Sequence, residues 1–294
     1  MTVDDSAAVA RHLWIVGPGR LGLAIGSLLL QREAVQAITF SGRAHAPPHS
    51  IFEDDRVQFR DAAEVPSDAP TAILITVPDA AIEEVARELS ERGLRRTTPV
   101  LHTSGALAGE PLEPLRRAGH PTGSLHPLAS VTDATAGERL VGAWFGVEGD
   151  PEARELADRI VTALDGFRLD VDARSKPIYH AAAVFASNYV VTLLSIAERL
   201  LVSSGVEAEA AREATTALAA GAVANCRERG AAAALTGPIA RGDVGTVRLH
   251  LERLSGPERA LYSVLAAHTL ELAREAGLST AAVAELGNLV EEET

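Results

Sequence analysis

A glycine-rich loop that directly follows an apolar run is the feature that most constrains the fold of this chain. The run covers residues 12–17, a helical pattern occupies 20–32, and the loop between them reads Gly17-Pro18-Gly19-Arg20-Leu21-Gly22. These glycines fit the pattern G-x-G-x-x-G in the strand–turn–helix context of a dinucleotide-binding βαβ unit. Gly17 would permit the tight turn, Gly19 would let the backbone approach a pyrophosphate, and Gly22 would let helix and strand pack closely. The alternative is a glycine turn in an α/β domain that binds no ligand.

The rest of the first half alternates between apolar strand patterns and helical patterns. We expect helices at 20–32, 80–93, 112–118 and 151–164, and strands at 12–17, 35–40, 57–59, 71–77, 99–103, 122–128, 143–149 and 167–171. Such alternation predicts parallel βαβ units. From about residue 175 the pattern is helical only, at 176–203, 207–229, 257–276 and 279–291. The predicted fold is therefore α/β, with a parallel-sheet domain at 1–172 followed by an all-helical domain at 173–294.

Composition excludes several classes of protein. The 294 residues carry a net charge of −13, which is unfavourable for a general nucleic-acid binder. A single cysteine, Cys226, excludes an internal disulfide and a thiolate-rich metal site, and we expect no metal. The first residues form no secretory signal, and the most apolar stretch, 181–197, is too short and too polar for a convincing membrane span. We expect a cytoplasmic protein whose ligands are small molecules.

Residues after the second strand indicate which dinucleotide would bind. NAD-dependent enzymes place an acidic residue near the end of this strand to hold the ribose 2′-hydroxyl. Here the strand ends with Ser41 and Arg43 and no acid, which favours a 2′-phosphate and therefore NADP(H). The alternative is that both are plain loop residues.

Further candidates follow the ends of the other strands, which share one edge of a parallel sheet. Val77, Pro78 and Thr103 are expected beside the nicotinamide, and Asp79 is interpreted mainly as the N-cap of the next helix. Ser104 and His126 are predicted to contact the substrate, although a lone histidine in such a place is more often structural.

Lys176 is the single lysine among 27 basic residues. Ser175 and Pro177 around it indicate a helix N-terminus, where the partial positive charge disfavours a merely solvated lysine and lowers its pKa. A lysine of lowered pKa suits proton transfer. Helical spacing places His180 on the same side, with Asn188 on an adjoining stripe. The alternative is a satisfied polar network inside a buried helix.

The segment 236–243 interrupts the helical domain. Arg241 could bind a substrate carboxylate, and Asp243 could orient it or cap the next helix. The alternative is a tight interhelical turn with a surface arginine.

Together these segments resemble a group of proteins with a Rossmann-like N-terminal domain and a helical DUF2520 domain, which are distant relatives of ketopantoate and pyrroline-5-carboxylate reductases. The resemblance is carried by residues 17–22, 75–82, 101–107, 123–130, 176–189 and 234–247. It implies that Lys176 protonates a carbonyl oxygen during hydride transfer, as a lysine does in the hydroxyacid and ketopantoate enzymes. Those enzymes carry Asn four residues later, where this chain has His180, so Asn188 is expected to take over the orienting role. The family also implies a homodimer through the helical domain.

The leading hypothesis is an NADPH-dependent reductase of a small carbonyl compound, such as the 2-keto acid ketopantoate. An imine reductase similar to the pyrroline-5-carboxylate enzymes is the second hypothesis. A catalytically silent NADP(H)-binding sensor is the third.

Overall fold

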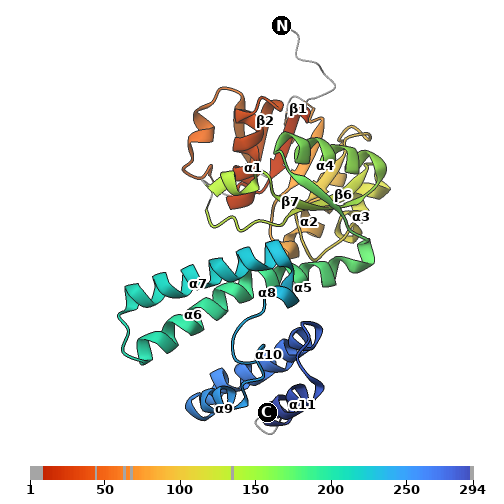
Figure 1. Cartoon of the computed structure of the whole chain (residues 1–294). Coiled ribbons are helices and arrows are strands. Elements are labelled where there is room, and N and C mark those ends of the chain that lie inside the picture. Colours follow the sequence, from red (N-terminus) through yellow and green to blue (C-terminus); the bar gives the residue numbers. More distant parts are fainter. Residues whose placement is uncertain (1–8, 44, 62–63, 67–68, 134–135, 292–294) are drawn as a thin grey trace. The chain divides into compact units, whose positions relative to one another are not determined.

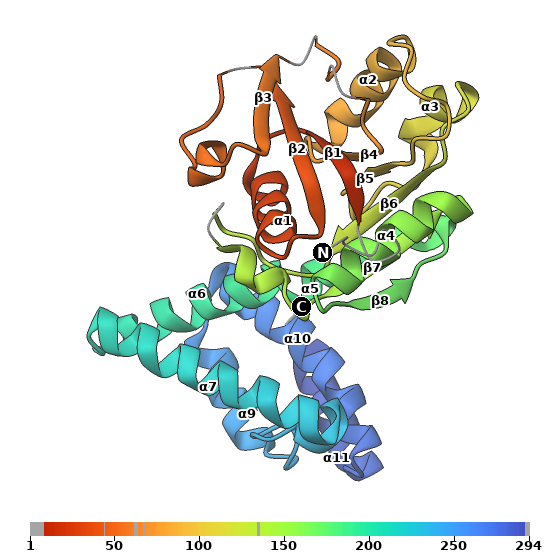
Figure 2. The ribbon, with the colours of Figure 1, turned by 90° about the horizontal axis from the view of Figure 1, so that it is seen from above.

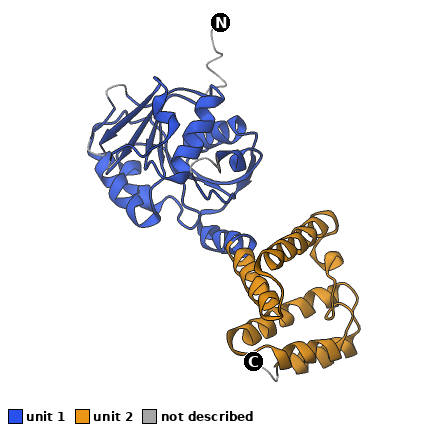
Figure 3. Cartoon of the chain, turned by 90° about the vertical axis from the view of Figure 1, so that its left-hand side faces the viewer, with its two compact units in different colours: residues 1–187 blue, residues 188–294 orange. Residues whose placement is uncertain are grey.

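The computed structural model describes residues 9–43, 45–61, 64–66, 69–133 and 136–291, which belong to two compact units (Figure 1). Unit 1 comprises residues 1–187 and unit 2 residues 188–294 (Figure 3). The boundary expected between 172 and 173 stays a prediction. The observed division falls later because the helix that begins at Lys176 hydrogen-bonds to the sheet domain.

Unit 1 is built on an eight-stranded sheet in the order β3-β2-β1-β4-β5-β6-β7-β8 (Figure 2). The strands are β1 (Ala10–Val16), β2 (Val35–Gly42), β3 (Val57–Asp61), β4 (Ala72–Ile75), β5 (Val100–His102), β6 (Thr122–Pro127), β7 (Trp144–Gly149) and β8 (Phe167–Asp170). The predicted fold class is confirmed, but β7 pairs with β6 in the antiparallel direction, against the expectation of parallel units. The reason is the connection, which contains only the short turn η3 (Ala136–Leu140) instead of a crossover helix.

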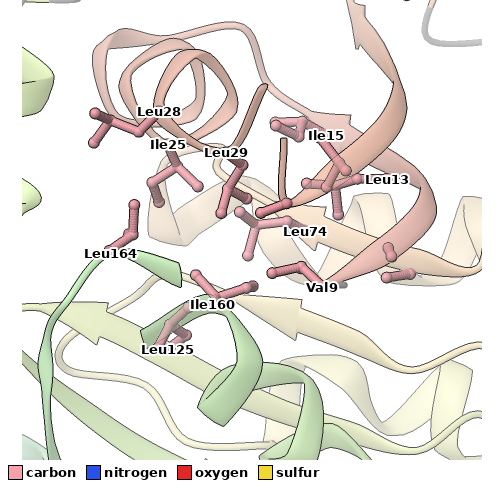
Figure 4. Packing of buried hydrophobic residues seen from close by; sticks show 14 of the residues in the cluster. Val9, Leu13, Ile15, Ile25, Leu28, Leu29, Leu74, Leu125, Ile160 and Leu164 are labelled. Carbon is pink, nitrogen blue, oxygen red and sulfur yellow. The ribbon is translucent and has the colours of Figure 1, made fainter. Parts of the chain in front are cut away.

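Helices cover both faces of this sheet. They are α1 (Arg20–Gln31), α2 (Asp79–Ser90), α3 (Glu113–Arg117) and α4 (Pro151–Ala163), with short 3₁₀ turns η1 (Ser50–Glu53), η2 (Glu110–Leu112) and η4 (Ala173–Ser175). Alternate residues of β1 pack on the two faces of the sheet, because successive side chains of a strand point to opposite sides. Leu13 and Ile15 pack with α1 and α4 (Figure 4), whereas Trp14 and Val16 pack with α2 and α3. Both cores hold the strand ends in place, and these ends carry the predicted site residues.

The expected helix 176–203 is two helices. α5 (Lys176–Ala186) ends at Ser187, whose backbone leaves the helical region at φ −125° and ψ −72°, and α6 (Asn188–Ser203) begins there. Unit 2 continues with α7 (Ala208–Arg229), α8 (Ala231–Ala234), α9 (Val244–Arg253), α10 (Gly256–Glu275) and α11 (Thr280–Glu291). Of these, α8 and α9 lie outside the helix ranges predicted from the sequence.

The apolar composition of 176–203 suggested a buried helix, but in the single chain most of these residues are at least partly exposed. Lys176 is the buried residue of α5, and α6 has none in the part of the chain that the structure describes. Large apolar side chains stay exposed, among them Phe185 at 68% and Val191 at 67%. The stretch Ala173–Ser203 is the one described helical segment that is long and apolar enough to cross a membrane by length and composition, with a mean hydropathy of 1.5. The sequence analysis, which considered only residues 181–197, had set this possibility aside.

We predict that Gly22→Ala destabilises the fold whereas Gly19→Ala does not. A Cβ at Gly22 would lie 2.5 Å from both the carbonyl oxygen of Gly17 and Oγ1 of Thr76, while a Cβ at Gly19 meets nothing within 4 Å. Overpacking of this kind costs about 1–3 kcal/mol. Urea unfolding of both variants measures the difference, and equal stability of the two would contradict the prediction.

Candidate functional site

The turn between β1 and α1 has the geometry that the glycine pattern predicts. Gly17 adopts a φ of +107°, a left-handed conformation that glycine takes without strain. Its N–H donates to the carbonyl of Ser41 at 2.9 Å, and its own carbonyl accepts from the Thr76 hydroxyl at 2.5 Å. Gly19 is the N-cap of α1 and faces open space. The positive end of the helix is therefore accessible at the sheet edge, as an anion site requires.

A cleft of about 650 Å³ opens beside this turn. It brings together six of the predicted cofactor residues, namely Gly17, Pro18, Ser41, Arg43, Val77 and Pro78. Two other residues of the loop have different tasks. Arg20 donates to the carbonyl of Thr132 at 3.1 Å, and Leu21 packs against the hydrophobic core.

The predicted role of Ser41 needs correction. The residue borders the cleft, but its side chain is fully buried and its hydroxyl accepts a hydrogen bond from the Trp14 indole at 2.9 Å. Because the residue is fully buried, this hydroxyl does not reach a phosphate bound in the cleft. Arg43 is the group that can contact a phosphate in the cleft, because its side chain is 77% exposed.

Acidic groups share the cleft with Arg43. Glu84 lies 3.6 Å from the guanidinium, and Asp61 is paired with Gly42 in the sheet and lines the same space. An exposed ion pair of this length contributes little energy. Arg43 can therefore exchange Glu84 for a more highly charged anion at low cost.

The segment after β5 is held by its own hydrogen bonds. The Ser104 hydroxyl donates to Asp79 at 2.9 Å and accepts the N–H groups of Ala106 and Leu107. Thr103 is bonded to the carbonyl of Ile75. The predicted contact of the Ser104 hydroxyl with substrate is therefore unfavourable, since all its bonding capacity is used. Asp79 begins α2 after an N-cap at Pro78, so it is not itself the cap.

His102, the last residue of β5, stabilises the same segment through both of its ring nitrogens. It is fully buried, one ring nitrogen lies 2.7 Å from the carbonyl of Ala108, and the other accepts from the N–H of Ser104 at 3.1 Å. This pairing requires a neutral ring with its proton on Nε2. Burial lowers the pKa of His102 to about 4, and the Lys176 charge acts in the same direction.

Lys176 lies at the N-terminus of α5 but does not face open space. The residue is 1% exposed, and its ammonium donates to the Ser104 carbonyl at 2.8 Å and to the Ser124 hydroxyl at 2.9 Å. Burial lowers the pKa of Lys176 to about 8, against the opposing effect of Glu148 and Asp79. The side chain thus connects α5 to the segment after β5 and to β6.

Glu148 and Ser124 belong to this cluster and were missed by the sequence analysis. They face each other across the β6–β7 pair, and the Ser124 hydroxyl hydrogen-bonds to the Glu148 carboxylate. Burial raises the pKa of Glu148, while the Lys176 charge works against that shift. One carboxylate oxygen, Oε1, is buried without a hydrogen-bond partner among the described residues. The antiparallel pairing of β7 was not predicted, so nothing in the sequence placed Glu148 beside Lys176.

His126 and His180 meet at Gly105. Their ring centroids lie 5.6 Å apart, and a Cβ on Gly105 would fall 2.4 Å from His180 Nδ1 and 2.7 Å from His126 Nε2. Tyr179, also missed from sequence, lies with its hydroxyl 3.0 Å from His126 Nδ1. Burial lowers the pKa of His126 to about 4, helped by the Lys176 charge and by His180. Lys176 and both predicted histidines therefore lie in one cluster, at the edge where β5 and β6 end.

The three remaining predicted residues belong to unit 2. Asn188 is the first residue of α6, and its carbonyl accepts from Thr192 at 3.2 Å. Asp243 caps α9 through the Thr246 N–H at 3.0 Å, which is the alternative that the sequence left open. This capping lowers the pKa of Asp243. Arg241 is exposed in the turn before it. A role in substrate binding for these residues stays a prediction.

Comparison with known families agrees with this geometry. Residues 4–127 match the Rossmann-like domain, and residues 143–269 match the domain of unknown function DUF2520. The chain combines a Rossmann-like domain with a DUF2520 domain. The DUF2520 match begins with β7, so it covers β7, α4 and β8 in addition to the first helices of the C-terminal half.

Solved structures share this architecture. A protein from Thermotoga maritima is 25% identical, with a TM-score of 0.71, over 90% of this chain and 98% of its own. A proposed NADP oxidoreductase from Bacteroides fragilis is 20% identical, with a TM-score of 0.70 over the same shares. A pyrroline-5-carboxylate reductase from Coxiella burnetii is 14% identical, with a TM-score of 0.59 over 97% and 99%. No curated protein matches the chain.

The buried state of His102 predicts an acid-sensitive fold. Its pKa is about 4 in the folded chain and about 6.5 in the unfolded one, so the unfolded state binds more protons between these values. The contribution of His102 to the free energy of unfolding is complete above pH 6.5 and falls as the pH drops toward 4. The expected loss at pH 4.5 is about 2–3 kcal/mol from this group.

Urea unfolding at pH 7 and pH 4.5 tests this, with His102→Gln as the variant and the exposed His268→Gln as control. Between pH 7 and pH 4.5, the free energy of unfolding of His102→Gln should fall by about 2–3 kcal/mol less than that of the wild type. The control should show the same fall as the wild type. An unchanged pH dependence in His102→Gln would contradict the assignment.

Proposed function

We propose that the protein is an NADPH-dependent reductase of a small carbonyl compound, with 2-keto acids such as ketopantoate as the substrate class. The observation that carries the proposal is the glycine turn at the N-terminus of α1, which opens onto the cleft containing Arg43 and Pro78. The polar cluster around Lys176 lies along the same sheet edge, at the ends of β5 and β6. In a parallel sheet this edge is where dinucleotide and substrate meet.

The residues present fit NADP(H). Gly19 leaves space over the helix N-terminus for a pyrophosphate, and the 2′-phosphate would pair with Arg43 at the end of β2. Pro78, which follows β4 and lines the same cleft, would offer an apolar surface to the nicotinamide half. When bound, the cofactor supplies the hydride.

The charge of Lys176 favours a carbonyl substrate. A developing oxyanion gains from a nearby ammonium, whereas a cationic iminium would be repelled. The predicted role of Lys176 as direct proton donor is less favourable, because its ammonium is buried and bonded to Ser104 and Ser124. We assign it the tasks of electrostatic stabilisation and of holding the edge together.

Imine reduction is the second candidate. It is favoured by the similarity of fold to pyrroline-5-carboxylate reductase from Coxiella burnetii, which extends over almost the whole of both chains. The neutral state of His126 is compatible with a cationic substrate, but the Lys176 charge is not.

We propose further that two copies of the chain associate through the helical region, and that the protein acts in the cytoplasm without nucleic acid or membrane as a partner. The exposed apolar side chains of α5, α6 and α7 support the dimer, with Leu218, Ile178, Phe185 and Val191 as the most exposed of them. A second copy presents the same helices, so a two-fold interface would cover both surfaces at once. Obligate interfaces of this kind bury about 2,000 Å² or more.

The proposed activity predicts that the wild-type protein oxidises NADPH in the presence of a 2-keto acid. A panel of keto acids and cyclic imines, followed at the NADPH absorbance, tests both candidates. Turnover with imines alone would favour the second candidate. Binding of NADPH without any turnover would instead identify a sensor and contradict the proposal.

We predict that Arg43→Gln weakens NADPH binding by about 10- to 150-fold, the range expected for one charge-assisted phosphate contact. NADH affinity should change much less, because NADH lacks the phosphate. The control is Arg56→Gln, which removes a guanidinium paired with Asp54 outside the cleft. Fluorescence titration of the wild type and both variants measures the six affinities, and equal losses for both cofactors in Arg43→Gln would refute the assignment.

The dimer proposal predicts twice the mass of one chain, 61.6 kDa from a chain mass of 30.8 kDa, in light scattering at micromolar concentration. Replacing Leu218, which is 77% exposed on α7, with Glu should shift the protein toward the monomer. A wild-type monomer that floats with lipid vesicles would show that these helices bind a membrane instead.

A further inference from the structure

We propose that His126 is the group that donates a proton to the reacting oxygen of the substrate, and that Tyr179 positions it by fixing which ring nitrogen carries the hydrogen. This inference rests on the proposed function and names the acid for it. It replaces Lys176 in that task, since the lysine is 1% exposed and two of its three ammonium hydrogens are bonded to Ser104 and Ser124.

The tautomer of His126 follows from the partners of Tyr179. The phenol oxygen of Tyr179 lies close to Gly146, and its single hydrogen can be donated to only one strong acceptor. Two acceptors are within reach, His126 Nδ1 at 3.0 Å and the His126 carbonyl at 3.5 Å. The shorter contact has the better distance for an O–H donor. Nδ1 therefore accepts, and the ring hydrogen of the neutral imidazole is on Nε2.

The Nε2–H group of His126 is available to donate to a substrate. Among the described residues no hydrogen bond engages Nε2, and the side chain is only part-buried. Gly105 packs closely against this nitrogen, and a side chain at that position would cover it, since a Cβ there would lie 2.7 Å from Nε2. His180 Nδ1 borders the same glycine and is buried without a hydrogen-bond partner in the described part of the chain. A carbonyl compound with a second polar group would satisfy both rings.

The electrostatics support a neutral donor. The pKa of His126 is lowered to about 4, so the ring is uncharged at neutral pH and keeps one hydrogen. Burial raises the pKa of Tyr179 to about 12, so the phenol keeps its hydrogen as well. The His126 ring and the Tyr179 phenol therefore each keep one proton, and both protons can move when the substrate oxygen becomes strongly basic.

The proton balance of the step is complete. The carbonyl carbon gains a hydride, and its π electron pair moves onto the oxygen. The oxygen takes the proton from His126 Nε2, while Nδ1 takes the proton of Tyr179. An aliphatic alkoxide is a stronger base than a tyrosinate, even with the tyrosine pKa at about 12, so the transfer is downhill. The Lys176 ammonium, 5.7 Å from the tyrosine ring centre, stabilises the tyrosinate until water reprotonates it.

The tautomer can be measured without any substrate. Long-range proton–nitrogen correlation spectra of ¹⁵N-labelled protein distinguish a protonated Nε2 from a protonated Nδ1. We expect the Nε2–H form in the wild type and a mixture of forms in Tyr179→Phe. A wild-type ring protonated at Nδ1 overturns the inference.

The chain offers a matched control for this experiment. Tyr262 and His250 form the same kind of pair in unit 2, with the hydroxyl 2.9 Å from Nδ1 and ring centroids 5.7 Å apart. Tyr262→Phe should alter the spectrum of His250 alone and leave turnover unchanged. A change at His126 in this variant would mean that the spectra report general loosening of the fold, which counts against the assigned role of Tyr179.

Kinetics with the active keto acid test the donor itself. His126→Asn keeps an amide near the position of Nδ1 for Tyr179 but removes the Nε2 donor, so kcat should fall by about 10²–10⁴-fold. His126→Gln places an N–H group near the position of Nε2 and should recover part of that loss. Tyr179→Phe should lower kcat by about 10-fold or more while KM and NADPH affinity stay within about 3-fold.

The outcomes separate this inference from the proposed function. A wild-type protein that reduces a keto acid, with His126→Asn equally active, overturns the role of His126 and leaves the reductase proposal intact. A wild-type protein that binds NADPH but reduces nothing overturns both.

Discussion

A buried ammonium is the interaction on which the candidate site depends. Lys176 connects the first turn of α5 to the carbonyl of Ser104 and to the hydroxyl of Ser124. Burying a charge is costly unless it is compensated, and the buried carboxylate of Glu148 on the neighbouring strand compensates this one. Arginine would not substitute easily, because its planar guanidinium is larger and cannot give up its charge. The single lysine of the chain is explained by this confined position as well as by any part in catalysis.

The arrangement of α5 follows from that bond. Once Lys176 is held, the next turn of the helix places Tyr179 beside His126, and His180 follows at Gly105. The histidine rings are in this way oriented by a helix and by two strand ends, which are more rigid supports than loops. Burial lowers the pKa of both His102 and His126, and the charge of Lys176 acts in the same direction. The edge thus combines one buried cation with neutral imidazoles, an environment that favours developing negative charge.

The cofactor half of the edge is organised by backbone rather than by charge. The tight turn at Gly17 and the close approach of Gly22 to Thr76 leave the helix N-terminus open, and Arg43 is the exposed cation of the cleft beside it. Glu84 keeps that cation occupied through a weak surface contact. By contrast, the exposed apolar sides of α5 and α6 have no comparable function within one chain, and the proposed dimer would cover them.

The sequence alone determined the strands, the helices of unit 1 and the glycine turn, because each depends on local periodicity and on the backbone freedom of particular glycines. It also identified Lys176, His126 and His180, since an isolated lysine at a helix start and polar residues after buried strands are visible without any tertiary contact. It did not identify Ser124, Glu148 or Tyr179, nor that the Ser41 and Ser104 hydroxyls are already engaged. Those facts depend on the antiparallel pairing of β6 with β7 and on the packing of α5 against the sheet. Hydrogen-bond partners far apart in sequence are chosen by tertiary structure, and so only the fold decided which of the predicted groups remain free to react.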